Sequence, residues 1–195
     1  MPRDPFFSKP FLYIDVETTG QAIEQGGEMC EIGAVLVDRQ TLEPIKELNL
    51  MLAVSNPNGR TEEQLSVNHY NRFNFKDWAE TMAPRPAMLR LVEFGRGAVP
   101  CAWNTAFDRL WVEGYFHREG IPCGYGEPFD HHWVCVMSLW SDYLDLRDID
   151  LGDVKFNMNN VAKWCGVPEE PKLHEAIHGA RTAAALHKRY RDIVR

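Results

Sequence analysis

The sequence predicts an α/β fold in which a mixed sheet is covered by helices on both faces. Two observations support this prediction. Three strand-like stretches come first with short connections between them, and helix-like and strand-like stretches alternate afterwards. Closely spaced strands favour antiparallel pairing, whereas a helix between two strands favours a parallel pair.

The three expected strands lie at residues 11–16, 28–38 and 42–54. The first, in PFLYIDVET, is mostly apolar and ends at two carboxylates. The second, EMCEIGAVLVD, is rich in apolar residues, and the third, LEPIKELNLMLAV, alternates between apolar and polar residues. Connections of four to ten residues make these strands antiparallel neighbours.

The rest of the chain predicts most of the helices. Residues 55–98 are polar and interrupted by prolines, which predicts short helices, one of them beginning near Pro86. AVPCAW predicts a short buried strand, and a helix follows at residues 105–118. HHWVCVMSL resembles a last strand, and further helices are expected at residues 138–146, 157–165 and 173–194.

Length and charge limit the classes of function. A chain of 195 residues is expected to form one domain, residues 1–195, with its core at about 11–190. Its net charge of -7 argues against a general coat for nucleic acid, but not against an enzyme that acts on a strand end. No apolar run approaches the ~20 residues of a membrane span, and five scattered cysteines lack a C-x-x-C pair. We therefore expect a cytoplasmic protein without a membrane partner.

Acidic residues stand at the ends of two expected strands. Asp15 and Glu17 are separated by one residue, so on a strand both point to the same face. Two like charges there raise each other's pKa unless a cation joins them. Asp108 lies early in the helix that follows AVPCAW. Each acid taken alone is ordinary at a solvated strand end or in a first helical turn.

Together these segments resemble a known family. YIDVETTG, EIGAVLVD, NTAFD and H-x-x-x-x-G-A-R-T-A are similar, in this order, to the three motif blocks of the DEDDh 3′–5′ exonucleases, which include polymerase proofreading subunits and RNase T. NNVAKWCGVP resembles the region before the last block, and the likeness covers about residues 11–190. It implies a ribonuclease H-like core: a five-stranded mixed sheet, its first three strands antiparallel, with helices on both faces.

The resemblance also implies a reaction. Asp15, Glu17 and Asp108 would hold two divalent cations, Mg²⁺ or Mn²⁺, and His174 would be the general base. The implied activity is metal-dependent hydrolysis of phosphodiester bonds at a single-stranded or frayed 3′ end of DNA or RNA, releasing nucleoside monophosphates. A protein partner or a homodimer is compatible with this prediction. The residues expected to contact the nucleotide are Thr18, Thr19, Gly20 and Asn104.

One position departs from the family pattern. The family has an Asp five residues after the histidine, where this chain has Gly179. His178 or Glu175 would have to compensate, although imidazole is a poorer ligand for Mg²⁺ than for Zn²⁺ or Mn²⁺. Three explanations stay open: an inactive relative that still binds nucleic acid or a partner, an altered metal preference, or a substitution introduced into the chain.

The same C-terminal stretch supports a different class of enzyme. His174, Glu175 and His178 form H-E-x-x-H, the zinc-binding helix of metallopeptidases. Pro171, however, leaves little room for a helix before His174, and a third zinc ligand is missing because residue 184 is an alanine. A zinc metallopeptidase is therefore a distant alternative.

A second histidine pair is expected to be structural. His131 and His132 fall in the stretch assigned to the last strand, where neighbouring side chains point to opposite faces. On that geometry the two rings do not share a metal ion.

Overall fold

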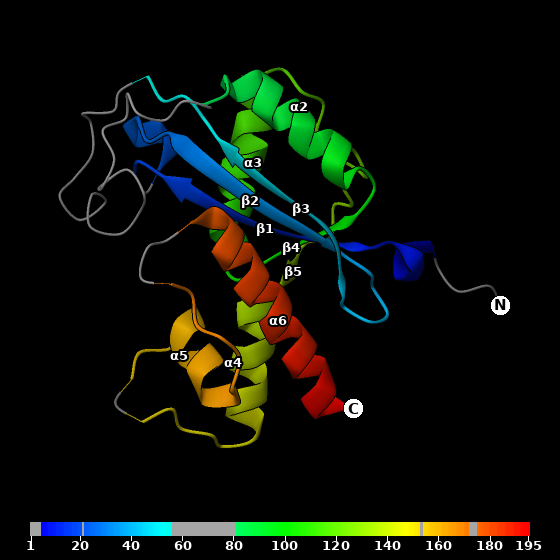
Figure 1. Ribbon diagram of the computed structural model, residues 1–195, viewed down its shortest axis with the longest axis vertical. Coiled ribbons are helices and arrows are strands. Elements are labelled where there is room, and N and C mark those ends of the chain that lie inside the picture. The colour runs from blue at the N-terminus through cyan, green and yellow to red at the C-terminus, as the bar shows by residue number, and fades with distance from the viewer. Residues whose placement is uncertain (1–4, 21, 56–80, 153, 172–174) are drawn as a thin grey trace.

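The computed structural model describes residues 5–20, 22–55, 81–152, 154–171 and 175–195. Five strands form one sheet in the order β3-β2-β1-β4-β5 (Figure 1). The strands are β1 (Phe11–Thr18), β2 (Met29–Val37), β3 (Pro44–Met51), β4 (Val99–Ala102) and β5 (Val134–Cys135). β1 pairs antiparallel with β2, and β2 pairs antiparallel with β3. β4 runs parallel to both β1 and β5, so the predicted mixed sheet with three antiparallel strands first is confirmed.

Helices cover both faces of this sheet, as predicted. In Figure 1, α2 (Pro84–Gly95) and α3 (Thr105–Arg118) lie on one side of it. The other side carries α4 (Val136–Leu146), α5 (Met158–Cys165) and the long α6 (Ala176–Val194). Two short 3-10 turns, η1 (Pro5–Ser8) and η2 (Ile23–Gln25), flank β1 in the sequence.

The alternation of β1 divides the apolar core into two clusters. Leu12, Ile14 and Val16 pack with residues of α2 and α3, such as Met88 and Trp111. Phe11 and Tyr13 point the other way and pack with residues of α4, α5 and α6. By the same alternation, Asp15 and Glu17 belong to the face that α6 covers.

The stretch expected to form the last strand is mostly helical. Only Val134 and Cys135 pair with β4, and α4 begins at Val136. The helix is amphipathic, because Val136, Trp140 and Leu144 recur every four residues and are buried. Apolar β-branched and aromatic residues fit either a short strand or a buried helix face, so the local pattern misplaced this boundary.

The other predicted helices are present within a few residues of their expected ends. The helix expected near Pro86 is α2, which has proline in its first turn, where a missing N–H is tolerated. The remaining short helices expected in residues 55–98 fall largely on residues 56–80, which lie outside the described residues. In the described part of the chain, no helix is both long and apolar enough to cross a membrane.

A glycine on β2 lets α6 begin directly against the sheet. Gly33 pairs with Asp15 on β1. A Cβ atom on Gly33 would lie 2.1 Å from the carbonyl carbon of Ala176 and 2.2 Å from the nitrogen of Ile177. The first turn of α6 therefore rests on the backbone of β2, beside the acidic end of β1.

Candidate active site

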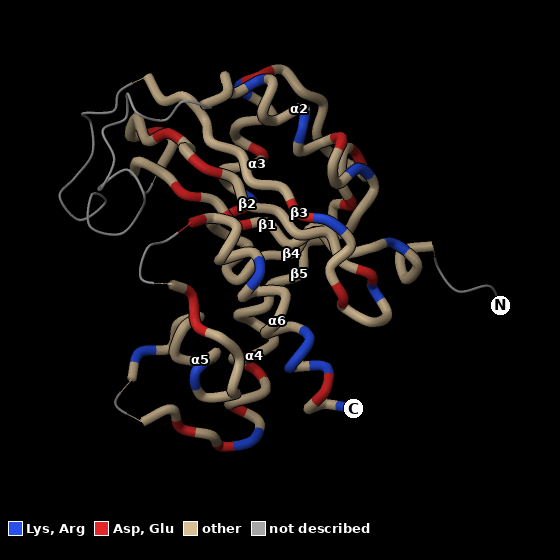
Figure 2. The backbone as a smooth tube through the Cα atoms, viewed as in Figure 1, with Lys and Arg blue, Asp and Glu red and all other residues tan. Residues whose placement is uncertain are grey.

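The acidic residues at the end of β1 are joined by the first turn of α3. Asp108 is 4% exposed, and its Oδ1 atom accepts a hydrogen bond from the backbone N–H of Val16 at 3.3 Å. This bond fixes the start of α3 beside the part of β1 that carries Asp15 and Glu17. In Figure 2, acidic positions gather along this end of β1 and β2, whereas basic positions lie farther along α6.

Asp15, Glu17 and Asp108 line one cleft. Its volume is about 160 Å³, and Asn104, which precedes α3, is part of its wall. The remaining lining residues come from the same strand end, from α3 and from the region around α5: Val16, Trp103, Phe107, Met158 and Glu170. Four of the residues predicted from the sequence are thus brought together, and Glu170 is an acid that the sequence analysis missed.

Burial raises the pKa of every carboxyl group in this cleft, and repulsion by neighbouring acids adds to the effect for Asp15 and Glu17. Burial raises the pKa of Asp15 well above its ordinary value, and the charges of Asp108, Glu17 and Glu170 raise it further. For Glu17, burial and then neighbouring acids raise the pKa to about 8. Burial also raises the pKa of Asp108 to about 8 and that of Glu170 to about 7. Among the described residues, no lysine or arginine forms an ion pair with Asp15, Glu17 or Asp108.

A further buried acid stands beside Glu17 on the next strand. Glu31 pairs with Glu17 across β1 and β2 and is 1% exposed. Burial raises its pKa to about 7, although the Asn49 side chain and the backbone of Ala176 hydrogen-bond to it and lower the pKa. Its Oε2 atom is buried and has no hydrogen-bond partner among the described residues. An orphaned buried carboxylate oxygen next to this cleft fits a site that a cation completes.

The carboxylate oxygens of the cleft are not arranged around one common position for a cation. Nowhere in the cleft do three of these acids place oxygens within 4.8 Å of one another. The Asp15 side chain lies against α6 instead, because a Cβ atom on Gly179 would come within 2.5 Å of its carboxyl carbon. Gathering the carboxylates around a cation therefore requires the Asp15 side chain to rotate away from Gly179.

The turn after β1 is held by its own hydrogen bonds. The Thr18 hydroxyl donates to the carbonyl oxygen of Gly20 at 2.7 Å. Thr19 is 5% exposed, and its hydroxyl oxygen accepts the backbone N–H of Glu28 at 2.9 Å. This tight turn follows Glu17 directly, but its three residues are not among those that line the cleft.

Comparison with protein families agrees with this geometry. The sequence model of the RNase T family, described as exonuclease, matches residues 12–187. The chain belongs to this exonuclease family. A comparison with curated protein sequences finds no match.

Solved structures share the fold of this exonuclease-family chain at low sequence identity. A structure of exonuclease I superposes with a TM-score of 0.79 at 14% identity over 94% of the chain. The zinc-bound complex of E. coli exonuclease I with single-stranded DNA gives 0.76 at 13% identity over 93%. A complex of exonuclease I with the SSB C-terminus gives 0.77 at 13% identity over 95%. The chain spans 40–41% of the length of these three proteins.

The geometry of α6 argues against the zinc-peptidase alternative. The helix begins at Ala176 and Glu175 is its N-cap, so the glutamate of H-E-x-x-H does not lie on an established helix. His174 lies outside the described residues. His178 has its Nδ1 atom 3.7 Å from the Glu175 carboxylate, and neither residue lines the cleft. The two residues considered as replacements for the missing aspartate are therefore not placed in the acidic cleft.

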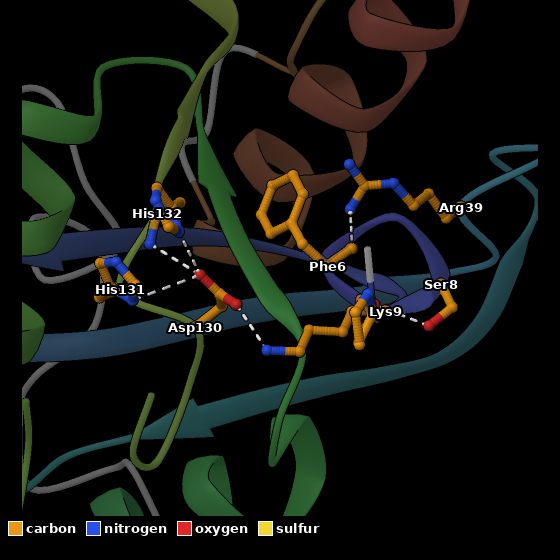
Figure 3. A network of polar contacts seen from close by, with 8 residues as sticks. Phe6, Ser8, Lys9, Arg39, Asp130, His131 and His132 are labelled. Atoms are coloured by element: carbon orange, nitrogen blue, oxygen red, sulfur yellow. Dashed lines mark hydrogen bonds and ion pairs between the residues drawn. The ribbon is translucent and has the colours of Figure 1, made fainter. Parts of the chain in front are cut away.

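The second histidine pair is closer together than the sequence indicated. His131 and His132 precede β5, and their ring centroids are 3.8 Å apart beside Asp130 (Figure 3). The prediction of opposite faces was wrong, because it required both residues to be in the strand. The Asp130 carboxylate is already occupied: Oδ2 accepts from Lys9 at 2.6 Å, and Oδ1 accepts the His132 N–H at 3.0 Å. This network ties Lys9, which follows η1, to the segment before β5.

Proposed function

We propose that this chain is a metal-dependent 3′–5′ exonuclease that hydrolyses phosphodiester bonds at the end of a single strand and releases nucleoside monophosphates. The observation that supports this most is the cleft in which the half-buried Asp15 and Glu17 lie together with the buried Asp108, without a basic partner among the described residues. In a member of the exonuclease family, such a donor set suits hard divalent cations.

Each residue has a role in this proposal. Asp15, Glu17 and Asp108 would hold Mg²⁺ or Mn²⁺, and bound cations would neutralise charge on the scissile phosphate and activate water. His174 would accept the proton of the attacking water, because imidazole titrates near neutrality.

The nucleotide would be positioned by the walls of the cleft. Trp103 and Phe107 offer aromatic rings on which a terminal base can stack without sequence preference. Asn104 offers an amide, and the turn of Thr18, Thr19 and Gly20 offers backbone groups to the terminal sugar and phosphate. A single-stranded DNA substrate is favoured by the fold shared with exonuclease I, which is described in complex with single-stranded DNA. A protein partner comparable to the SSB C-terminus is a further expectation.

A 5′-labelled single-stranded oligonucleotide with MnCl₂ tests the activity. We expect a ladder shortened from the 3′ end, which a phosphorothioate at the last linkage blocks. Asp108→Asn is the matched control, because the amide oxygen keeps the hydrogen bond to Val16 while the charge is lost. We expect it to lose at least ~100-fold in rate. No cleavage by the wild-type chain, or equal cleavage by Asp108→Asn, would refute the assignment.

Gly179 supports a second candidate, a strand-end-binding protein without turnover. The Gly179→Asp variant tests it in the same assay, with binding followed by fluorescence anisotropy. Cleavage by the variant alone would identify an exonuclease fold silenced at this position. Binding without cleavage by both chains would favour the binding protein.

A further inference from the structure

The acidic cleft contains one carboxylate that the family pattern does not explain. Glu170 lies between α5 and α6, and it lines the cleft with Asp15, Glu17 and Asp108. The family pattern places the fourth acid on the last helix, at position 179, where this chain has glycine. One acid is therefore absent from α6, and another lines the cleft from the segment between α5 and α6.

The backbone around Glu170 is fixed rather than free to swing away. Its N–H donates to the Asn159 side-chain oxygen at 2.8 Å. Asn159 lies in the first turn of α5, and Asn157 caps that helix by accepting the N–H of Asn160 at 2.9 Å. The segment that carries Glu170 is thus attached to a capped helix, and Met158 of that helix lines the cleft as well.

Glu170 lies close to the proposed ligands. It lines the same cleft of about 160 Å³ as Asp15 and Glu17, whereas Glu175 does not line it. A like charge placed beside buried carboxylates is unfavourable unless a cation is shared between them.

Gly179, at the position of the family's aspartate, determines where the Asp15 side chain lies. Because Gly179 has no side chain, the Asp15 carboxylate lies where its Cβ atom would be. An aspartate at position 179 would collide with Asp15 in its present position. Asp15 can therefore lie against α6 only because residue 179 is a glycine.

We propose that Glu170 is the fourth carboxylate of the metal centre and takes over the role that the family pattern gives to an aspartate at position 179. The inference rests on the proposed function, since it assumes that Asp15, Glu17 and Asp108 bind divalent cations. Glu170 belongs to the segment that follows α5 and not to α6 itself, so residue 170 contributes the ligand that α6 lacks.

Calorimetric titration of the full chain with MnCl₂ tests the inference without relying on activity. Glu170→Gln is compared with Glu169→Gln, which removes the same charge from the adjacent, exposed residue. We expect Glu170→Gln to weaken Mn²⁺ binding by about 10–100-fold and Glu169→Gln to stay within about twofold of the wild type. The difference should persist at 0.5 M NaCl, where long-range charge effects are screened.

Two further variants separate the possible failures. Asp15→Asn should bind Mn²⁺ far more weakly than the wild type, which establishes that the cleft is the site. Glu170→Gln combined with Gly179→Asp should recover at least about tenfold of the lost affinity, because Asp15 turns away from α6 when it binds a cation and residue 179 can then supply the carboxylate. Circular dichroism and urea unfolding in EDTA confirm that each variant is folded.

The outcomes distinguish the inference from the proposed function. Wild-type affinity in Glu170→Gln, with weak binding in Asp15→Asn, would overturn the role of Glu170 and leave the metal site in place. Equal losses in Glu169→Gln and Glu170→Gln would also overturn it, because the effect would then be one of net charge. A wild-type chain that does not bind Mn²⁺ would overturn both.

Discussion

When divalent cations are absent, the unfolding free energy of the chain should fall as the pH rises from 6.5 to 8.5. Asp108 has an ordinary pKa of 3.8, which burial raises to about 8 in the folded chain. The folded state therefore binds more protons than the unfolded state between these values, and the unfolding free energy falls as the pH rises. This loss of unfolding free energy is absent below about pH 3.8 and complete above about pH 8.

The magnitude follows from the part of this interval that the experiment covers. Each pH unit between the two pKa values is worth about 1.4 kcal/mol, so Asp108 alone should lower the unfolding free energy by about 2 kcal/mol between pH 6.5 and pH 8. Glu17, whose pKa is also raised to about 8, adds to this loss. Starting at pH 6.5 leaves out most of the opposing effect of His187, whose pKa burial lowers from 6.5 to about 3. Its remaining titration in the unfolded chain raises the unfolding free energy by only ~0.4 kcal/mol above pH 6.5.

Urea unfolding followed by tryptophan fluorescence measures this effect, with EDTA and a reductant present throughout. Asp108→Asn should show a shallower fall, because it removes the charge and keeps the acceptor for Val16. Saturating MnCl₂ should reverse the slope, since ligands bind the cation in their deprotonated form. An unfolding free energy in EDTA that stays flat or rises over this range would refute the reasoning, as would an unchanged slope in Asp108→Asn.

Two further predictions concern contacts that stabilise the fold. Gly33→Ala should cost about 3 kcal/mol in urea unfolding, because its Cβ would meet the backbone of Ala176, which cannot rotate away. Gly97→Ala is its control, because nothing lies within 4 Å of the Cβ atom that it adds. Placing alanine at the φ of +73° should cost only ~1 kcal/mol. Nuclease activity should be unchanged in this variant. Asp130→Asn should cost about 1–2 kcal/mol at pH 7, because hydrogen bonds from Lys9 and His132 outweigh burial and lower the Asp130 pKa to about 2. That difference should shrink in unfolding experiments as the pH falls from about 4 to about 2, and a constant difference would contradict it.

Much of the fold could be predicted because its signals are local. The apolar run before Asp15, the short connections to β2 and β3, and the periodicity of α3 and α6 all lie within single segments. The boundary at Val136 could not be found in this way, because a two-residue strand leads directly into a helix and both are apolar. The histidine pair was misjudged for the same reason: His131 and His132 precede the strand.

Only those site residues that belong to a sequence motif could be predicted. Asp15, Glu17 and Asp108 were identified from recognisable blocks, and the structure places them in one cleft. Glu170 carries no such signal, because its position depends on the return of the chain after α5 and on the bond to Asn159. Glu31 stands in the EIGA block, but its burial beside Glu17 follows from strand pairing and from the close approach of α6.

The contact between Gly33 and the start of α6 has a consequence for folding. It joins residues separated by more than 140 positions in the chain, and α6 packs on all three antiparallel strands. Such distant contacts form slowly, because a long loop must close before they contribute. During synthesis the strands emerge first, with one apolar face uncovered until α6 follows. We therefore expect newly made chains to depend on prompt docking of α6, and its delay to expose a surface prone to aggregation.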